Sequence, residues 1–289
     1  MYFPAANTVC TSLSPFTVKY IYGRMPMYFV GFIGGSGLIP KIIHFCWFGG
    51  KPLPELALHC IDSWKKYCPD YEIKRWDENN FDLNENSYVK EAFEAKKWAF
   101  ITDYVRLKVL YDQGGIYMDT DVEVIGSLDP FLNDKAFSGF ENGKDIPTGI
   151  MASEKDHPFF KKLLDYYQDR HFILPNGDLD LQTNVITITR IASEYGFIPN
   201  NTKQDIGGMI FYPKDYFCPK DNKTGEVHRT ENTVCIHHFN GSWRTTEESK
   251  LKKVSQRLNR KYGKFGTFLF LIYKYALHPK NIIKRLRKK

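Results

Sequence analysis

The chain has 289 residues, of which 43% are hydrophobic and 25% charged, so it is long enough to form a folded domain with a substantial core. Its net charge of +7 is unevenly distributed. Residues 249–289 contain 14 Lys or Arg and no Asp or Glu, which leaves 26 basic against 33 acidic residues elsewhere. An acidic body argues against a nucleic-acid-binding protein, because contacts to phosphates need a basic face on the fold itself.

The N-terminal residues 1–38 match no folded pattern. Residues 25–38 contain an apolar run, but glycines interrupt it and it is shorter than the roughly 18 to 20 residues of a membrane span. A signal peptide and a start codon assigned too far upstream both remain open. We therefore expect a poorly ordered or wrongly assigned extension, a domain over residues 39–248 and a basic, aromatic tail over 249–289.

Strand-like and helix-like patterns alternate from Ile39 onward. Strands are expected at Ile39–Phe48, Tyr71–Trp76, Ile116–Ile125, Ala136–Phe140, Thr148–Ala152, Met209–Tyr212 and Thr233–His238. Helices are expected at Glu55–Tyr67, within Glu91–Tyr111, after Pro158 and over Gln182–Tyr195. This alternation predicts an α/β fold, Rossmann-like, with a mixed, mostly parallel sheet and flanking helices.

The cysteines show no metal-binding pattern. No two of them form a CxxC pair or a zinc-like spacing, and their density is low for a disulfide-stabilised secreted protein. We expect reduced, mostly buried thiols in a cytosolic protein. The six cysteines are Cys10, Cys46, Cys60, Cys68, Cys218 and Cys235.

The strongest chemical signal is the segment 114–124, which reads GGIYMDTDVEV. Side chains two apart on a strand share a face, so Asp119 and Asp121 are expected to project the same way. Two such carboxylates can bind a divalent cation that also binds diphosphate oxygens. A solvated turn with two chance acids is the alternative, because DxD is a common sequence.

An acidic and a basic residue precede this segment. Asp103 and Arg106 lie three apart within a helical pattern and therefore share a helix face. A carboxylate can accept hydrogen bonds from sugar hydroxyls, and a guanidinium can bind hydroxyl or phosphate oxygens. An ordinary surface ion pair is the alternative.

Three blocks of this sequence resemble glycosyltransferase family 32, the DXD-containing sugar transferases, and more distantly the glucosyltransferase domains of clostridial toxins. The blocks are residues 99–124, residues 39–54 (IPKIIHFCWFGGKPLP) and residues 235–243 (CIHHFNGSW). The resemblance implies a GT-A fold and a retaining transfer of a hexose from a nucleotide diphosphate sugar, with Mn²⁺ or Mg²⁺ as cofactor. It favours uridine diphosphate sugars as donors, with guanosine diphosphate mannose second.

The resemblance also implies roles for individual residues. Trp47 would stack on the nucleobase, with His44 nearby on the same strand, and Asp103 and Arg106 would hold the donor sugar. Asp119 would contact the donor or reach the metal through water, and Asp121 would bind the metal directly. Trp243 would donate its indole N–H to the diphosphate.

His237 and His238 are consecutive, so on an extended chain they face opposite ways and at most one is expected to bind the metal. The spacing to Trp243 favours His238. A neutral imidazole is a good ligand for manganese alongside oxygen ligands.

The basic tail predicts contact with a membrane surface. Residues 265–277 are apolar and aromatic, and residues 280–289 carry six basic residues. An interfacial anchor on an anionic leaflet fits this pattern, and a final helix packed on the domain is the alternative. We expect a peripheral protein at the cytoplasmic face of the plasma membrane that uses a glycan or lipid-linked acceptor in capsular or other surface polysaccharide biosynthesis.

Three other functions remain as alternatives. Residues 116–122 also fit the DxD strand of a haloacid-dehalogenase-type phosphatase acting through Asp119 and Asp121, although that strand usually lies near the start of the fold. A toxin-like transferase that modifies host protein is a second alternative. A non-catalytic membrane-binding module is a third, but it leaves all three blocks unexplained.

Overall fold

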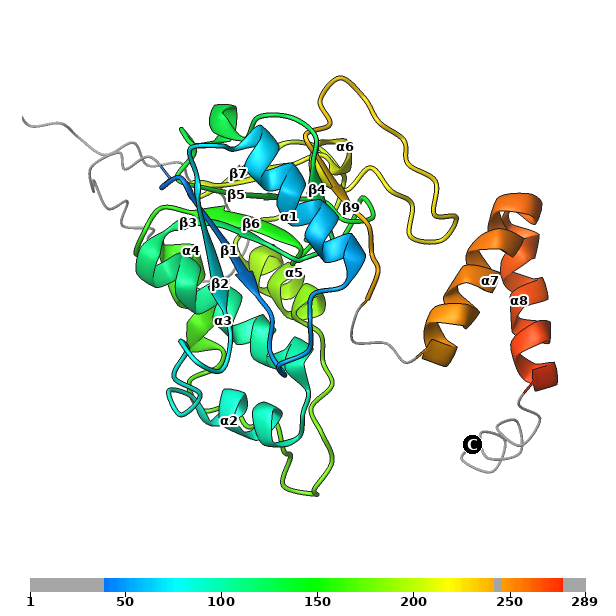
Figure 1. Cartoon of the computed structure of the whole chain (residues 1–289), viewed down its shortest axis with the longest axis horizontal. Helices are drawn as coiled ribbons and strands as arrows, with labels where there is room; N and C mark the ends of the chain where they lie inside the picture. The colour runs from blue at the N-terminus through cyan, green and yellow to red at the C-terminus, as the bar shows by residue number, and fades with distance from the viewer. Residues whose placement is uncertain (1–38, 242–245, 278–289) are drawn as a thin grey trace, which may run out of the picture. The chain divides into compact units, whose positions relative to one another are not determined.

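The computed structural model describes residues 39–241 and 246–277, which belong to one compact unit, Ser36–Lys289 (Figure 1). The predictions for residues 1–38, for Trp243 and for the basic residues 280–289 lie outside the described residues. The helices are α1 (Glu55–Tyr67), α2 (Ser87–Glu94), α3 (Trp98–Gln113), α4 (Pro158–Asp165), α5 (Asn184–Glu194), α6 (Lys214–Phe217), α7 (Thr246–Tyr262) and α8 (Lys264–Leu277).

Seven strands form the main sheet, in the order β2-β1-β3-β6-β5-β8-β7. Five of them run in one direction, while β6 and β7 are antiparallel to their neighbours. The strands are β1 (Ile42–Cys46), β2 (Glu72–Trp76), β3 (Gly115–Met118), β5 (Ala136–Gly139), β6 (Ile150–Ser153), β7 (Gln204–Ile206) and β8 (Met209–Tyr212). The predicted class, a Rossmann-like α/β fold with a mixed, mostly parallel sheet and flanking helices, is confirmed.

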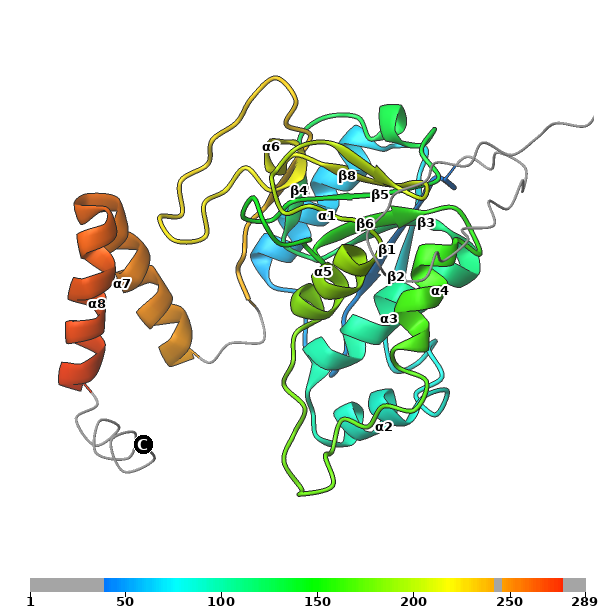
Figure 2. The ribbon, with the colours of Figure 1, turned by 180° about the vertical axis from the view of Figure 1, so that it is seen from behind.

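The sheet separates two hydrophobic cores (Figure 2). Because side chains alternate along a strand, Tyr117 enters the core that α3, α4 and α5 cover, whereas Ile116 and Met118 enter the core beneath α1. On the α1 side, the indole of Trp64 donates to the carbonyl of Val122 at 2.7 Å. This bond fixes α1 against the small second sheet, which contains β4 (Val122–Val124) and β9 (Cys235–His237).

The predicted helical stretch Glu91–Tyr111 is two helices. Lys96 adopts a left-handed φ of 54°, and this conformation separates α2 from α3. Helix α3 is buried on most of its circumference, because it packs on the sheet on one side and on α2 and α4 on the others. A buried α3 carries its polar residues into the interior, where they need partners.

A pair of glycines joins α3 to β3. Gly114 and Gly115 have φ values of 68° and 103°, which only glycine adopts without strain. A Cβ at Gly114 would lie 2.9 Å from the carbonyl oxygen of Ser153, and one at Gly115 would lie 2.7 Å from that of Ile42. The chain can therefore turn directly from the helix into the middle of the sheet, and β3 delivers the residues that follow to its carboxyl end.

Candidate metal and sugar-donor site

Asp119 and Asp121 lie in a turn, not within one strand. The predicted strand Ile116–Ile125 ends at Met118 and resumes at Val122 as β4 in the second sheet. The amide of Asp119 donates to the carbonyl of Gly149 at 2.8 Å, and the amide of Val122 donates back to Asp119 at 3.0 Å. The chain turns here because β3 belongs to one sheet and β4 to the other, and the two carboxylates lie between them.

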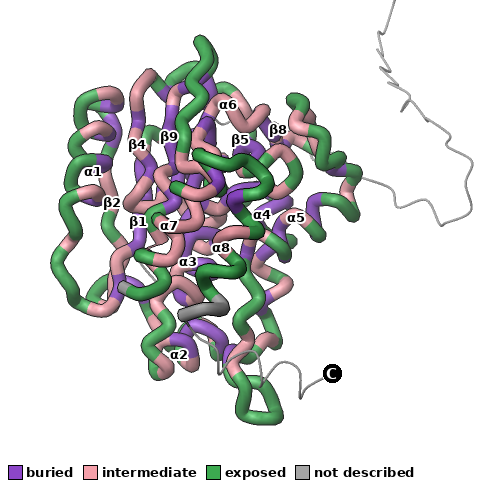
Figure 3. The backbone as a smooth tube through the Cα atoms, turned by 90° about the vertical axis from the view of Figure 1, so that its right-hand side faces the viewer, coloured by how far each residue is buried: buried purple, intermediate pink, exposed green. Residues whose placement is uncertain are grey.

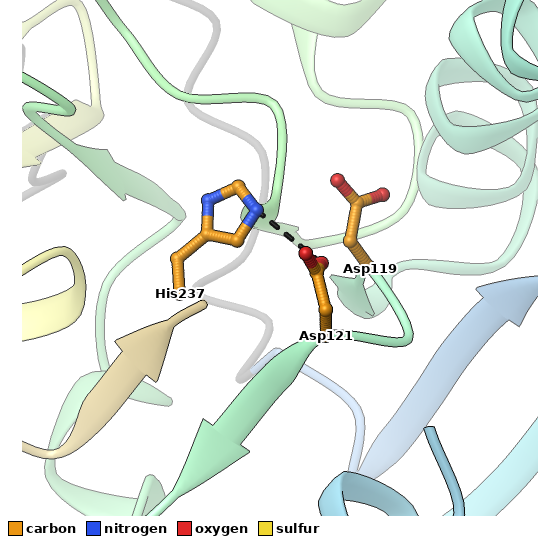
Figure 4. Close-up of side chains that lie close together, drawn as sticks. All are labelled: Asp119, Asp121 and His237. Atoms are coloured by element: carbon orange, nitrogen blue, oxygen red, sulfur yellow. Dashed lines mark ion pairs between the residues drawn. The ribbon is translucent and has the colours of Figure 1, made fainter. Parts of the chain in front are cut away.

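His237 completes a group of three possible metal ligands with these acids (Figure 4). Strand β9 pairs with β4 so that His237 is opposite Val122. Its Nε2 lies 3.3 Å from Oδ1 of Asp121, and one ligand atom from each of the three residues lies within 4.8 Å of the others. Two carboxylates and an imidazole are a donor set suited to manganese or magnesium.

His238 is turned away from this group, which corrects the prediction that it binds the metal. Its Nε2 lies 2.9 Å from a carboxylate oxygen of Glu123. The two histidines do face opposite ways, as the alternation along a strand requires. The β4–β9 register alone would set His238 opposite Asp121, so the turn before β4, and not the spacing to Trp243, brings the carboxylate of Asp121 to His237.

For both Asp121 and His237, burial and the neighbouring charge shift the pKa in opposite directions. Burial alone would raise the pKa of Asp121, but the charge and hydrogen bond of His237 hold that pKa well below its usual range. Burial alone would lower the pKa of His237, but Asp121 raises it well above the usual value. Each group thus favours the charged form of the other, and a bound cation would compete with the imidazole proton.

The space around the imidazole is tightly defined. A Cβ on Gly149 would lie only 2.6 Å from Cε1 of His237, so glycine alone fits there. The ring of Phe239 lies against the other side, with a centroid separation of 4.1 Å. The Nδ1 atom of His237 is buried and has no hydrogen-bond partner among the described residues. The three residues thus fit a cation-binding role, with an imidazole held in place by packing.

Arg106 forms the second half of the site. Its side chain is only 5% exposed, and its guanidinium contacts the carboxylate of Asp103 at 3.2 Å and that of Asp119 at 3.3 Å. It also donates to the carbonyl of Thr148 and lies over the ring of Tyr117, 4.7 Å from the centroid. The alternative of a solvated surface pair is therefore wrong, since this is a buried charge network.

Asp103 is the most deeply enclosed carboxylate of the network. Burial raises its pKa to about 6, and the neighbouring charge of Arg106 limits the shift. The amide of Asn184, at the start of α5, donates to the backbone carbonyl of Asp103 at 2.8 Å and fixes this turn of α3. A carboxyl group with a raised pKa can donate or accept a hydrogen bond, and the guanidinium beside it can donate one, so the two can bind a polar ligand together.

His44 is part of the core and not of an open donor site. It is fully buried, its Nε2 bonds the carbonyl of Gly114 at 2.9 Å, and its Nδ1 accepts from the indole of Trp76 at 3.1 Å. Both ring nitrogens are thus engaged, and burial lowers its pKa to about 4. In this arrangement neither ring nitrogen is free for a ligand, and the role of His44 in donor binding stays a prediction.

Trp47 is partly buried and packs on the core beneath α1. Its indole N–H donates to the carbonyl of Lys51 at 2.6 Å, so this donor is already used within its own turn. One face of the ring remains a candidate for stacking. Trp243 lies outside the described residues.

Sequence reasoning missed Tyr117 and Gly149, and it ranked His237 behind His238. The hydroxyl of Tyr117 donates to Asp119 at 2.8 Å, and the two residues are two apart on one chain, so the alternation of a strand could have paired them. No local signal marks Gly149, because its role follows from β6 packing beside β3. Glu141 also lies near the group, and burial raises the pKa of its carboxyl against the opposing charge of His237.

The chain matches a known family over part of its length. Residues 54–138 match the model of the glycosyltransferase sugar-binding region containing the DXD motif. The resemblance predicted from the sequence is confirmed over this range, which contains Asp103, Arg106, Asp119 and Asp121. The blocks at residues 39–54 and 235–243 lie essentially outside the matched range.

Curated relatives from fungi resemble the same region. The chain is 32% identical over 133 residues to inositol phosphoceramide mannosyltransferase 3 of Schizosaccharomyces pombe, covering 45% of this chain and 37% of the relative. It is 28% identical over 190 residues to mannosyl phosphorylinositol ceramide synthase CSH1 of Saccharomyces cerevisiae, covering 62% and 49%. The chain therefore spans half or less of the length of these relatives.

Solved glycosyltransferase structures are similar at low identity. The PaToxG glycosyltransferase has a TM-score of 0.38 at 23% identity, covering 45% of this chain and 60% of that one. The galactosyltransferase LgtC has a TM-score of 0.39 at 16% identity, covering 73% and 92%.

Proposed function

We propose that this chain is a metal-dependent glycosyltransferase with a GT-A type fold, which moves a hexose from a nucleotide diphosphate sugar to a glycan or lipid-linked acceptor. The observation that carries the proposal is the meeting of two half-sites at Asp119. On one side are Asp121 and His237, which suit a divalent cation, and on the other is the buried pair of Asp103 and Arg106. Asp119 and Asp121 form the DXD motif, and Asp103 and Arg106 precede it within the same matched region. His237 lies outside that region.

The residues divide the work between the two halves of the donor. Asp119, Asp121 and His237 would hold Mn²⁺ or Mg²⁺, which neutralises charge on the departing nucleoside diphosphate. Arg106 and Asp103 would bind sugar hydroxyls, as the resemblance implies, through a guanidinium and a carboxylate that lie 3.2 Å apart. Trp47 offers a ring face to a nucleobase, and Trp243 remains a proposed donor to the diphosphate.

The reaction is proposed to retain the configuration at the sugar. No residue of the sequence is marked as a nucleophile, so we favour attack by the acceptor on the face that the diphosphate leaves. A diphosphate oxygen then takes the acceptor's proton. Trapping a sugar covalently bound to a protein side chain would contradict this mechanism.

The identity of the donor is the first question for experiment. Sequence resemblance placed uridine diphosphate sugars first and guanosine diphosphate mannose second, whereas the names of the fungal relatives describe mannosyl transfer. Purified protein should be incubated with a panel of both classes of donor, with Mn²⁺, with a chelator and as the Asp121→Asn variant. Manganese-dependent release of one nucleoside diphosphate, lost in the variant, supports the proposal and identifies the donor.

The same panel tests the alternative. Hydrolysis of generic phosphate esters, with no nucleotide sugar bound or cleaved in the presence of candidate glycan and lipid acceptors, would contradict the transferase and favour a phosphatase acting through Asp119 and Asp121.

We further propose that the C-terminal helices bring the enzyme to an anionic membrane surface, where a lipid-linked acceptor of surface polysaccharide assembly would be met. Helix α8 exposes Phe265, Phe268 and Ile272, which are 58%, 55% and 51% exposed and share a helix face by their spacing. Figure 3 colours most of the described part of α8 as exposed or intermediate. Basic residues and no acids accompany this face in the sequence from 249 onward. Within residues 39–241 and 246–277, no helix is long and apolar enough to cross a bilayer.

Vesicle sedimentation tests this second proposal. The protein should bind vesicles that contain phosphatidylglycerol and not those of phosphatidylcholine alone, and Phe265→Ser with Phe268→Ser should weaken binding. Leu58→Ser, at a 50% exposed leucine of α1, is the matched control. Equal binding by all variants, or none by the native chain, would contradict membrane docking. A cytoplasmic location at the inner face of the plasma membrane remains part of the same proposal.

A further inference from the structure

Residues 238–240, called here the closing segment, follow β9 and are fastened to Asp121. The amide of His238 donates to the backbone carbonyl of Asp121 at 2.9 Å. The amide of Asn240 donates to Oδ2 of the same residue at 2.7 Å. Two positions of the closing segment, His238 and Asn240, are thus fixed by one residue, which is itself a proposed metal ligand. The geometry of the closing segment and that of the candidate metal site are therefore coupled.

Phe239 occupies a strained conformation at the centre of the closing segment. Its φ of 53° is left-handed, which is unusual and strained for a bulky residue. Such a conformation persists only where surrounding contacts enforce it. The conformation places the ring of Phe239 against the imidazole of His237, with an angle of 36° between the ring planes. The closing segment therefore controls the position of the imidazole.

Two lysines bind the carbonyls of the closing segment from opposite parts of the sequence. The ammonium of Lys220 donates to the carbonyl of His238 at 3.0 Å. The ammonium of Lys252 donates to the carbonyl of Phe239 and lies 6.0 Å from the centroid of its ring. Together with the bonds to Asp121, these contacts hold backbone groups of all three residues and supply the enforcement that the left-handed Phe239 requires.

Both lysines depend on helix α7. Lys252 is part of α7, and three further side chains of this helix donate to the backbone carbonyls of residues 222–224. These bonds measure 3.1, 3.2 and 3.0 Å and come from Gln256, Asn259 and Arg260. The loop they hold begins at Lys220, which forms an isolated bridge with Val227. Helix α7 thus reaches the closing segment directly and also through this loop.

We propose that Lys252 and Lys220 are positioning residues, and that α7 maintains the geometry of the proposed metal site through them. The two ammonium groups hold the closing segment in its strained form, and this segment holds His237 beside Asp121. The metal-binding consequence rests on the proposed function, whereas the positioning of the segment does not. Any event that displaces α7 would loosen the imidazole while leaving the acids of the β3–β4 turn in place.

Hydrogen–deuterium exchange tests the positioning without assuming any activity. The full-length Lys252→Met and Lys220→Met variants should exchange the amides of residues 235–241 about tenfold faster than the native chain, because the bonds that restrain them are lost. The exchange rates of peptides from α3 should be unchanged, which would show that the variants are folded. Lys253→Met, at an exposed neighbour in α7, is the matched control.

The dependence of activity on metal tests the consequence. The Mn²⁺ concentration for half-maximal turnover should rise about tenfold in Lys252→Met, as for other residues that orient a metal ligand, while kcat at saturating Mn²⁺ stays within twofold. Lys252→Arg should restore most of the affinity, because it retains a cationic donor.

Unchanged exchange over residues 235–241 in both lysine variants would overturn the positioning proposal. Faster exchange with an unchanged Mn²⁺ requirement would overturn its consequence for the metal. If the native chain neither binds Mn²⁺ nor turns over any donor, the proposed function fails, and the exchange result still decides whether the two lysines position the segment.

Discussion

The two half-sites that meet at Asp119 are built in different ways. The α3 half, with Asp103 and Arg106, comes from a buried helix, and its charges are satisfied within the core. The β9 half, with Asp121 and His237, comes from a small two-stranded sheet, and backbone bonds to the closing segment hold it. We infer that the first half belongs to the folded framework and that the second can be loosened without unfolding the protein.

The largest effect is expected for Asp121→Asn, in the β9 half. Loss of this carboxylate removes a proposed metal ligand and should lower kcat by a factor on the order of 10³. The unfolding temperature should change little, because Asn keeps the size of the side chain and His237 can then lose its proton. Donor turnover and thermal unfolding of the same preparation measure both quantities. A variant that retains native turnover would remove Asp121 from the site.

For Arg106→Met, in the α3 half, we expect a large loss of stability, whereas Asp121→Asn should leave stability nearly unchanged. Removing the guanidinium leaves Asp103 buried beside no cation, which should lower the free energy of unfolding by about 3 kcal/mol. Turnover should also fall, since the donor sugar loses a proposed partner. Urea unfolding measures the loss, and Lys161→Met, in an exposed ion pair of α4, is the control with little expected effect. A loss of unfolding free energy no larger than that of Lys161→Met would contradict the assignment of the α3 half to the folded framework.

The two adjacent histidines provide a sharper test of the β9 half. His237→Gln should raise the Mn²⁺ requirement by about 10 to 100-fold, whereas His238→Gln should change it less than twofold. The geometry gives this order, because only His237 faces the acids. Equal effects, or a larger effect at His238, would restore the prediction from the sequence.

The smallest effect concerns pH and the α3 side. The pKa of His44 is about 4 in the folded chain against an ordinary value of 6.5, so between these values only the unfolded chain binds the proton. The contribution of His44 to the free energy of unfolding should therefore fall as pH falls from about 6.5 to 4, by roughly 1 kcal/mol per unit, while Asp103, whose pKa is raised to about 6, gives the opposite slope below that pH.

His157 has the same shift, also to about 4, and would add to this slope. His157→Asn keeps an acceptor at the start of α4 and removes that contribution, so the difference between the slopes of the native chain and the variant reports on His157. Urea unfolding of both proteins at several pH values measures it. An unchanged slope in this variant would show that His157 is not held neutral in the folded chain.

Parts of the site were accessible from the sequence because they depend on local spacing. Asp103 and Arg106 share a helix face at any tertiary arrangement, and the helix Glu55–Tyr67 and strand Met209–Tyr212 were predicted with their observed bounds. The choice between His237 and His238 was not accessible, because it depends on how the turn before β4 directs Asp121 toward β9, which follows more than a hundred residues later. The turn at Asp119 was missed for the same reason, since its bond to Gly149 comes from a neighbouring strand.

The pairing of β4 with β9 also has a consequence for biogenesis. The acids of the β3–β4 turn leave the ribosome long before the histidine that completes the group, since the paired residues Glu123 and His238 are 115 positions apart. Closing so long a loop is entropically costly and slow compared with forming the local helices. Nascent chains stalled before β9 should therefore hold a largely assembled sheet that has not yet acquired metal affinity, and enzyme maturation would coincide with release of the C-terminal helices.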